Sequence, residues 1–133
     1  MYNTPVIIGF NMKNAINWFE IPVLNYERGI KFYESIFGFE MYRMPMGGND
    51  MAFFPCDRDG IGGALVHGNG YKPSADGTLV FLNGGDDLSG VLNRVEAAGG
   101  AIVVPKTLIT DEIGYFGIFI DTEGNKVALH SQK

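Results

Sequence analysis

The chain of 133 residues contains one cysteine, Cys56, and therefore cannot form a disulfide bond within a single molecule. Because small secreted domains commonly depend on such cross-links, the composition favours a cytoplasmic protein. No apolar run approaches the roughly 20 residues of a membrane-spanning helix, and the apolar stretch Val6 to Phe10 lacks the basic residues of a signal peptide. The sequence therefore predicts neither export nor insertion into a membrane.

Positive charge is also scarce, with 10 Lys and Arg against 15 Asp and Glu and a formal net charge of -5. Nucleic-acid binding requires a basic surface that neutralises phosphates, so nucleic acid is not an expected partner. The hydrophobic share of 46% is that of an ordinary globular domain and excludes a disordered chain. Nineteen scattered glycines predict many turns between short elements within one domain, residues 1–133.

The chain consists of two similar halves. In the first, a strand at Asn17 to Val23 precedes a helix that is capped by Asn25 and ended by Gly38, and three strands follow at 40–44, 50–55 and 62–67. In the second, a strand at 78–83 precedes a helix that is capped by Asp86 or Asp87 and ended at Gly99-Gly100, and strands follow at 101–106, 115–121 and 126–131. The sequence thus predicts an α+β fold of two βαβββ repeats at about 15–67 and 78–131, joined by a linker at 68–77. We expect a helix on one face of each sheet, with the two curved concave faces paired around a ligand cavity.

Two segments carry a resemblance to a known family. They are WFEIPVLNYERGIKFYESIFGFE at 18–40 and DTEGNKVALH at 121–130, and the segments GALVHG at 63–68 and VPKT at 104–107 add to it. The chain resembles the vicinal oxygen chelate superfamily, which includes glyoxalase I, bleomycin-resistance proteins and extradiol dioxygenases, and in particular its small bacterial glyoxalase-related members. The resemblance implies the fold of that superfamily and a homodimer, across which the arm Met1 to Ala15 is a candidate additional strand. Any reaction would be that of a lyase or isomerase related to lactoylglutathione lyase.

The resemblance also implies where a metal would be bound. The metal-binding members carry one ligand on the first and last strand of each repeat, and the corresponding residues here are Trp18, Ala64, Leu79 and Ala128. None of these side chains offers a donor that Zn, Ni, Fe or Mn accepts. We therefore expect no metal at the inherited site and no other cofactor.

Alternation along the strands predicts which side chains line the cavity. The candidate ligand-binding residues are Trp18, Val66, Leu79, Phe81, Asn83 and Tyr115. Glu20 and His130 are the candidate catalytic pair, in which Glu20 acts as a general base. The alternatives are a solvated Glu20, a frayed or superficial His130 close to the C-terminus, and core positions for Trp18 and Tyr115.

These residues favour a protein that binds, or transforms without a metal, a small organic molecule in the central cavity. The alternative is a metal-dependent lyase, isomerase or dioxygenase with a displaced site, for which Glu20, His67 and His130 are available although His67 is predicted to point outward. A third hypothesis is that the protein is an interaction domain whose cavity is filled by its own Trp18 and Phe81. Cys56 is expected to be an inert buried thiol.

Overall fold

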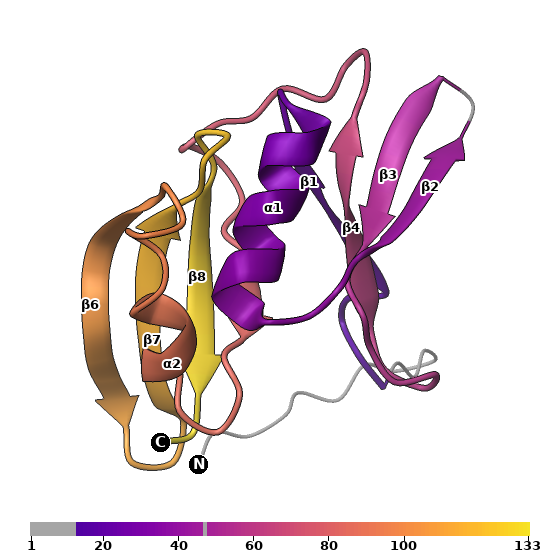
Figure 1. The fold of residues 1–133 in the computed structure, drawn as a ribbon. Helices are drawn as coiled ribbons and strands as arrows, with labels where there is room; N and C mark the ends of the chain where they lie inside the picture. The colour runs from indigo at the N-terminus through magenta and orange to yellow at the C-terminus, as the bar shows by residue number, and fades with distance from the viewer. Residues whose placement is uncertain (1–12, 47) are drawn as a thin grey trace.

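The protein folds into two four-stranded sheets (Figure 1), as seen in a computed structural model that describes residues 13–46 and 48–133. The first sheet has the strand order β1-β4-β3-β2, and the second has the order β5-β8-β7-β6. Among the described residues, the eight strands are β1 Trp18–Pro22, β2 Tyr42–Met46, β3 Asn49–Phe53, β4 Gly62–His67, β5 Phe81–Asn83, β6 Ala101–Thr110, β7 Gly114–Ile120 and β8 Lys126–Ser131. Helix α1 (Tyr26–Phe37) follows β1 and helix α2 (Ser89–Leu92) follows β5. The predicted pair of βαβββ units is therefore confirmed.

The two sheets have the same internal register. In the first, β1 runs parallel to β4 and Glu20 pairs with Ala64; in the second, β5 runs parallel to β8 and Phe81 pairs with Ala128. The other neighbouring strands of each sheet are antiparallel. Glu20 and Phe81 are therefore equivalent positions of the two units.

Helix α1 begins and ends as its sequence predicts. The Asn25 side chain accepts a hydrogen bond from the Arg28 backbone N–H at 3.0 Å, which satisfies one of the free donors of the first turn. Gly38 adopts a left-handed conformation with φ of 72° and donates to the Glu34 carbonyl.

Helix α2 is much shorter than predicted. Instead of continuing to Ala98, the α-helix ends at Leu92 and the chain proceeds through turns to Gly99. Several backbone bonds in this region span three residues rather than four, as from Arg94 N–H to the Val91 carbonyl, which is a tighter geometry than that of an α-helix. The predicted cap was wrong, because Leu88 is the N-cap residue and its side chain forms no capping hydrogen bond, although the Asp87 carboxylate just before it accepts from the Ser89 N–H at 2.9 Å. Strand β5 is also shorter, and β6 longer, than predicted.

The position of α1 between the two sheets determines which faces are buried (Figure 1). Tyr33 of this helix lies 5.5 Å from the Phe54 ring beside the first sheet and 6.3 Å from the Phe119 ring of the second. The core therefore occupies the inner faces of both sheets, and its largest fully buried side chains are Tyr33, Phe32, Phe119, Ile30, Ile36 and Leu65. The opposite faces, here called the outer faces, point away from α1. They were expected to enclose a cavity within one chain, but α1 separates the sheets instead.

The turn Asp121 to Asn125 of the second unit holds the first unit by hydrogen bonds. Its Asp121 carboxylate accepts a hydrogen bond from the Tyr33 hydroxyl at 2.7 Å, and its Glu123 carboxylate accepts from Arg28 Nε at 2.7 Å. Glu123 also accepts from the backbone N–H groups of Leu24 and Asn25 just before α1. The DTEGN motif that contributed to the family resemblance thus anchors α1 of the first unit to the second unit.

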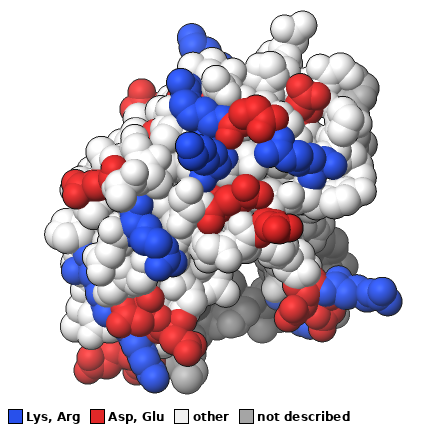
Figure 2. Space-filling view, in the orientation of Figure 1, with Lys and Arg blue, Asp and Glu red and all other residues white. Residues whose placement is uncertain are grey.

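Charged side chains are mixed on the face shown in Figure 2, where Lys and Arg alternate with Asp and Glu and do not form a continuous basic stripe. No helix in the part of the chain that the structure describes is long and apolar enough to cross a membrane. Most of the N-terminal arm, residues 1–12, lies outside the described residues.

Candidate functional site

A row of aromatic rings crosses the outer face of the first sheet. The Trp18 ring of β1 meets the Phe53 ring of β3 edge to face, with centroids 5.6 Å apart, and Tyr42 of β2 continues the row at 6.1 Å from Phe53. Trp18 is 44% exposed and Tyr42 is 64% exposed. Trp18 is therefore not a core residue of the single chain, and its indole is available to stack on another molecule.

Glu20 lies beside this row and is held by two donors. Trp18 Nε1 donates to one carboxylate oxygen at 3.3 Å, and the Tyr71 hydroxyl donates to the other at 3.2 Å. The Glu20 carboxylate raises the pKa of the Tyr71 hydroxyl through this hydrogen bond. Tyr71 belongs to the linker between the two units and was missed by the sequence analysis, since strand alternation carries no information about loops.

The outer face of the second sheet contains a hollow of about 420 Å³ that is lined by Phe81, Asn83 and His130. Phe81 is 52% exposed. His130 Nε2 lies 2.6 Å from the Ile113 carbonyl, so this nitrogen is the protonated one and Nδ1 is left as an acceptor in the neutral ring. The Asn83 side-chain oxygen accepts from the Gly85 N–H. Three of the predicted site residues thus lie together.

The structure does not bring all the predicted residues together within one chain. Glu20 and His130 lie on different sheets, while His67 faces Asp50 at 3.7 Å. Leu79 precedes β5 and is half-buried, and Val66 is buried. Tyr115 packs against the core, with the Lys106 ammonium 4.5 Å from its ring centroid.

The four positions at which the family resemblance predicts metal ligands carry side chains that do not fit a metal. Trp18, Ala64, Leu79 and Ala128 present an indole, two methyl groups and an isobutyl group, and none supplies a lone pair of the kind that Zn, Ni, Fe or Mn binds. Among residues 13–46 and 48–133, no three His, Cys, Asp or Glu side chains are grouped as a metal site would require.

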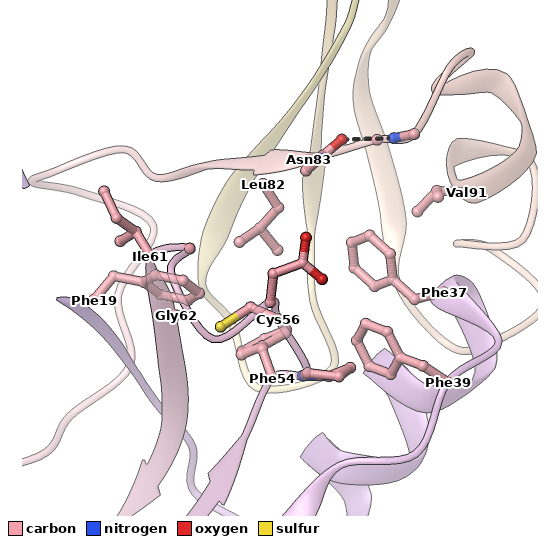
Figure 3. A pocket seen from close by; sticks show the side chains of 15 residues that line it. Phe19, Phe37, Phe39, Phe54, Cys56, Ile61, Gly62, Leu82, Asn83 and Val91 are labelled. Atoms are coloured by element: carbon pink, nitrogen blue, oxygen red, sulfur yellow. Dashed lines mark hydrogen bonds between the residues drawn. The ribbon is translucent and has the colours of Figure 1, made fainter. Parts of the chain in front are cut away.

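A larger cavity, of about 610 Å³, opens elsewhere in the molecule and was not predicted (Figure 3). Figure 3 shows the Phe37 and Phe39 rings along one wall, with Phe19 and Ile61 opposite them. Cys56 also lines this cavity and is exposed, so the expectation of a buried thiol was wrong, because the segment after β3 leaves the sheet. The Phe-rich segments at 37–39 and 53–54 were the available sequence signal for this cavity.

A family model described as the Glyoxalase/Bleomycin resistance protein/Dioxygenase superfamily matches residues 15–129. The chain belongs to this superfamily. No curated protein sequence matches the chain. Similar solved structures include a hypothetical protein from S. aureus, with TM-score 0.64, 20% identity and coverage of 91% of this chain and 95% of that one. A glyoxalase/bleomycin resistance protein from a Streptomyces species has TM-score 0.65 and 24% identity, covering 86% of this chain and 97% of that one.

Glyoxalase I from Zea mays is also similar, with TM-score 0.63, 19% identity and coverage of 86% of this chain. The chain spans only 43% of that longer enzyme. At these identities the structural matches establish the fold, and the activity has to be argued from the site.

Proposed function

We propose that the protein binds, or transforms without a metal, a small flat organic molecule on its outer sheet faces. The observation that carries the proposal is the exposed aromatic row with an oriented carboxylate beside it, at the position where Trp18 replaces a metal ligand. Indole and phenyl faces stack on flat molecules, and Glu20 accepts hydrogen bonds from their polar edges. If a reaction follows, Glu20 is the group that accepts a proton.

The same proposal includes a homodimer, because one chain presents two incomplete halves of a site. The outer face of the first sheet holds Trp18 and Glu20, and that of the second holds Phe81 and His130. A second copy that pairs unlike faces across a two-fold axis would cover these exposed aromatic side chains and bring Glu20 to His130. The lone Cys56 supports a cytoplasmic location.

Replacement of Trp18 tests the binding surface directly. Trp18 is the single tryptophan, so its emission should shift or quench when a ligand from a metabolite library binds. We expect Trp18→Ala to weaken the affinity about 10- to 100-fold, since a stacked aromatic contact contributes roughly 1 to 3 kcal/mol. Fluorescence titration of the wild type and calorimetry of the variant measure this. A library that never perturbs the emission would contradict the proposal.

Metal analysis separates this proposal from a displaced metal site. Protein purified without chelator is expected to contain far less than one equivalent of Zn, Ni, Fe or Mn by elemental analysis, because the inherited positions lack donors. Stoichiometric metal that is lost in Glu20→Ala would favour the metal-dependent lyase, isomerase or dioxygenase instead.

A further inference from the structure

The 610 Å³ cavity lies apart from the aromatic row of the proposed binding face. Four phenylalanine rings contribute to it, from β1, from the end of α1 and from the segment after β3: Phe19, Phe37, Phe39 and Phe54. These side chains point to the core side of the first sheet, whereas Trp18 and Glu20 lie on the outer face. The cavity is thus distinct from the aromatic row, although it shares Leu82, Asn83 and Gly85 with the hollow on the second sheet, and its interpretation does not depend on the proposed function.

The ring arrangement gives the cavity flat aromatic walls (Figure 3). Phe37 and Phe39 are stacked with centroids 5.0 Å apart and an interplanar angle of 3°, and Phe39 meets Phe54 edge to face at 6.0 Å. Phe19 lies 5.3 Å from Phe54 and extends this surface. All four rings are only partly buried. Since small-molecule sites measure about 300 to 1,000 Å³ and are mostly apolar, the cavity has the size and walls of such a site.

One charged side chain lines the cavity, the Asp57 carboxylate. Within the described ranges this carboxylate forms no hydrogen bond or ion pair, and no Lys or Arg lines the cavity with it. The faces of phenylalanine rings attract cations, and an anionic group nearby adds to that attraction. Charge and ring geometry therefore favour the same class of ligand.

We propose that this cavity is a second binding site, which takes a hydrophobic organic cation: an aromatic or bulky apolar body that carries an ammonium group. The apolar body lies between the phenylalanine rings, and the ammonium group lies near Asp57. A neutral analogue binds more weakly, and an anionic analogue is repelled.

Cys56 provides the readout, because it lines the cavity and is the single cysteine. Its sulfur packs over Gly62, where an added Cβ would lie 3.0 Å from Sγ and 3.5 Å from the Trp18 ring. Trp18 emission is therefore not an independent reporter for this cavity, whereas alkylation of Cys56 by neutral iodoacetamide reports on access to the thiol. The probes are 2-(aminomethyl)naphthalene, 2-naphthalenemethanol and 2-naphthoate, which share a ring system and differ in charge.

In the wild type, the amine is expected to slow alkylation of Cys56 at a concentration about 10-fold lower than the alcohol requires, and the naphthoate is expected to give no protection. Asp57→Asn should remove the advantage of the amine over the alcohol. The matched control is Asp59→Asn, which changes an exposed carboxylate in the same loop that does not line the cavity and should leave the advantage intact. Ile61→Trp, which places a larger side chain in the cavity, should abolish protection by both probes; circular dichroism verifies that each variant is folded.

If neither the amine nor the alcohol protects Cys56 from alkylation, the proposal is overturned. Equal effects of Asp57→Asn and Asp59→Asn would also overturn it, because the preference would then reflect the general negative charge of the chain. A loss of protection in Glu20→Gln with no effect of Asp57→Asn would assign the probes to the outer face. That last outcome would refute the second site without refuting the proposed function.

Discussion

Glu123→Ala is expected to lower the free energy of unfolding by about 2 to 4 kcal/mol, because a hydrogen bond to a charged group contributes roughly 1.5 to 3 kcal/mol and this carboxylate accepts several of them. Glu123 is 4% exposed, and its carboxylate accepts hydrogen bonds from Arg28, Thr122 and the backbone N–H groups of Leu24 and Asn25. The substitution leaves these two backbone donors without their acceptor, and such groups are costly when they are partly buried. It also releases the start of α1 from the second unit.

Chemical denaturation at pH 7 measures this effect. The matched control is Glu27→Ala, which removes the exposed pair between Glu27 and Arg43 and should leave the unfolding midpoint almost unchanged. Burial acts to raise the pKa of Glu123, but the hydrogen bonds from Arg28, Asn25 and Thr122 outweigh it and hold that pKa below its ordinary value of 4.5. The stabilisation by Glu123 is therefore present above about pH 4.5 and is lost as the pH falls through the folded pKa. A Glu123→Ala variant as stable as Glu27→Ala would contradict the role of this turn.

Phe81→Asp is expected to convert the proposed homodimer into a monomer. The exposed Phe81 ring lies on the outer face of the second sheet. In the proposed dimer this face packs against the outer face of the partner's first sheet, where Glu20 lies. In the dimer, a carboxylate at this position loses its hydration and lies near the Glu20 carboxylate of the other copy. Desolvation of a charge and the approach of two like charges each cost several kcal/mol. We expect the dissociation constant to rise at least about 100-fold, since about 2.7 kcal/mol corresponds to that factor.

Light scattering coupled to size-exclusion chromatography measures the mass of each variant. Leu24→Asp is the control, because Leu24 is apolar and at least as exposed as Phe81 but lies just before α1 and on neither outer face. If the wild type is monomeric at micromolar concentration, or if Phe81→Asp remains dimeric, the proposed interface is wrong.

The sequence predicted most of the local structure, because the relevant signals are local. The N-cap of Asn25, the end of α1 at Gly38 and the alternation along β1 each depend on a few neighbouring residues. The extent of α2 was not predictable in this way. Its apolar positions continue to Val95, but the chain there closes tighter turns as it approaches Gly99.

The placement of α1 between the sheets depends on tertiary packing, although the sequence of the helix gives one indication that both of its sides are covered. Phe32 and Tyr33 are consecutive and both fully buried, and consecutive residues of a helix point about 100° apart. A helix that buries both must therefore be covered over a wide arc, here by Phe54 on one side and Phe119 on the other.

For the candidate site, the sequence predicted the faces of individual side chains but not how those faces are arranged. Alternation identified Trp18, Glu20, Phe81 and His130 as side chains of the sheet faces, and it could not show that α1 holds these faces apart within one chain. Tyr71 and Asp57 belong to loops, and their positions follow from the path of the chain in three dimensions.

The central claim, that unlike outer faces of two copies form one site, is tested most directly by cross-linking across that site. Glu20→Cys and Phe81→Cys are prepared as separate chains in a Cys56→Ser background, mixed, and treated with a short bismaleimide. Because Glu20 and Phe81 occupy equivalent positions of the two units, we expect a covalent dimer that joins one chain of each kind, in excess of either chain alone. The absence of a mixed covalent dimer, with both chains folded, would contradict the account.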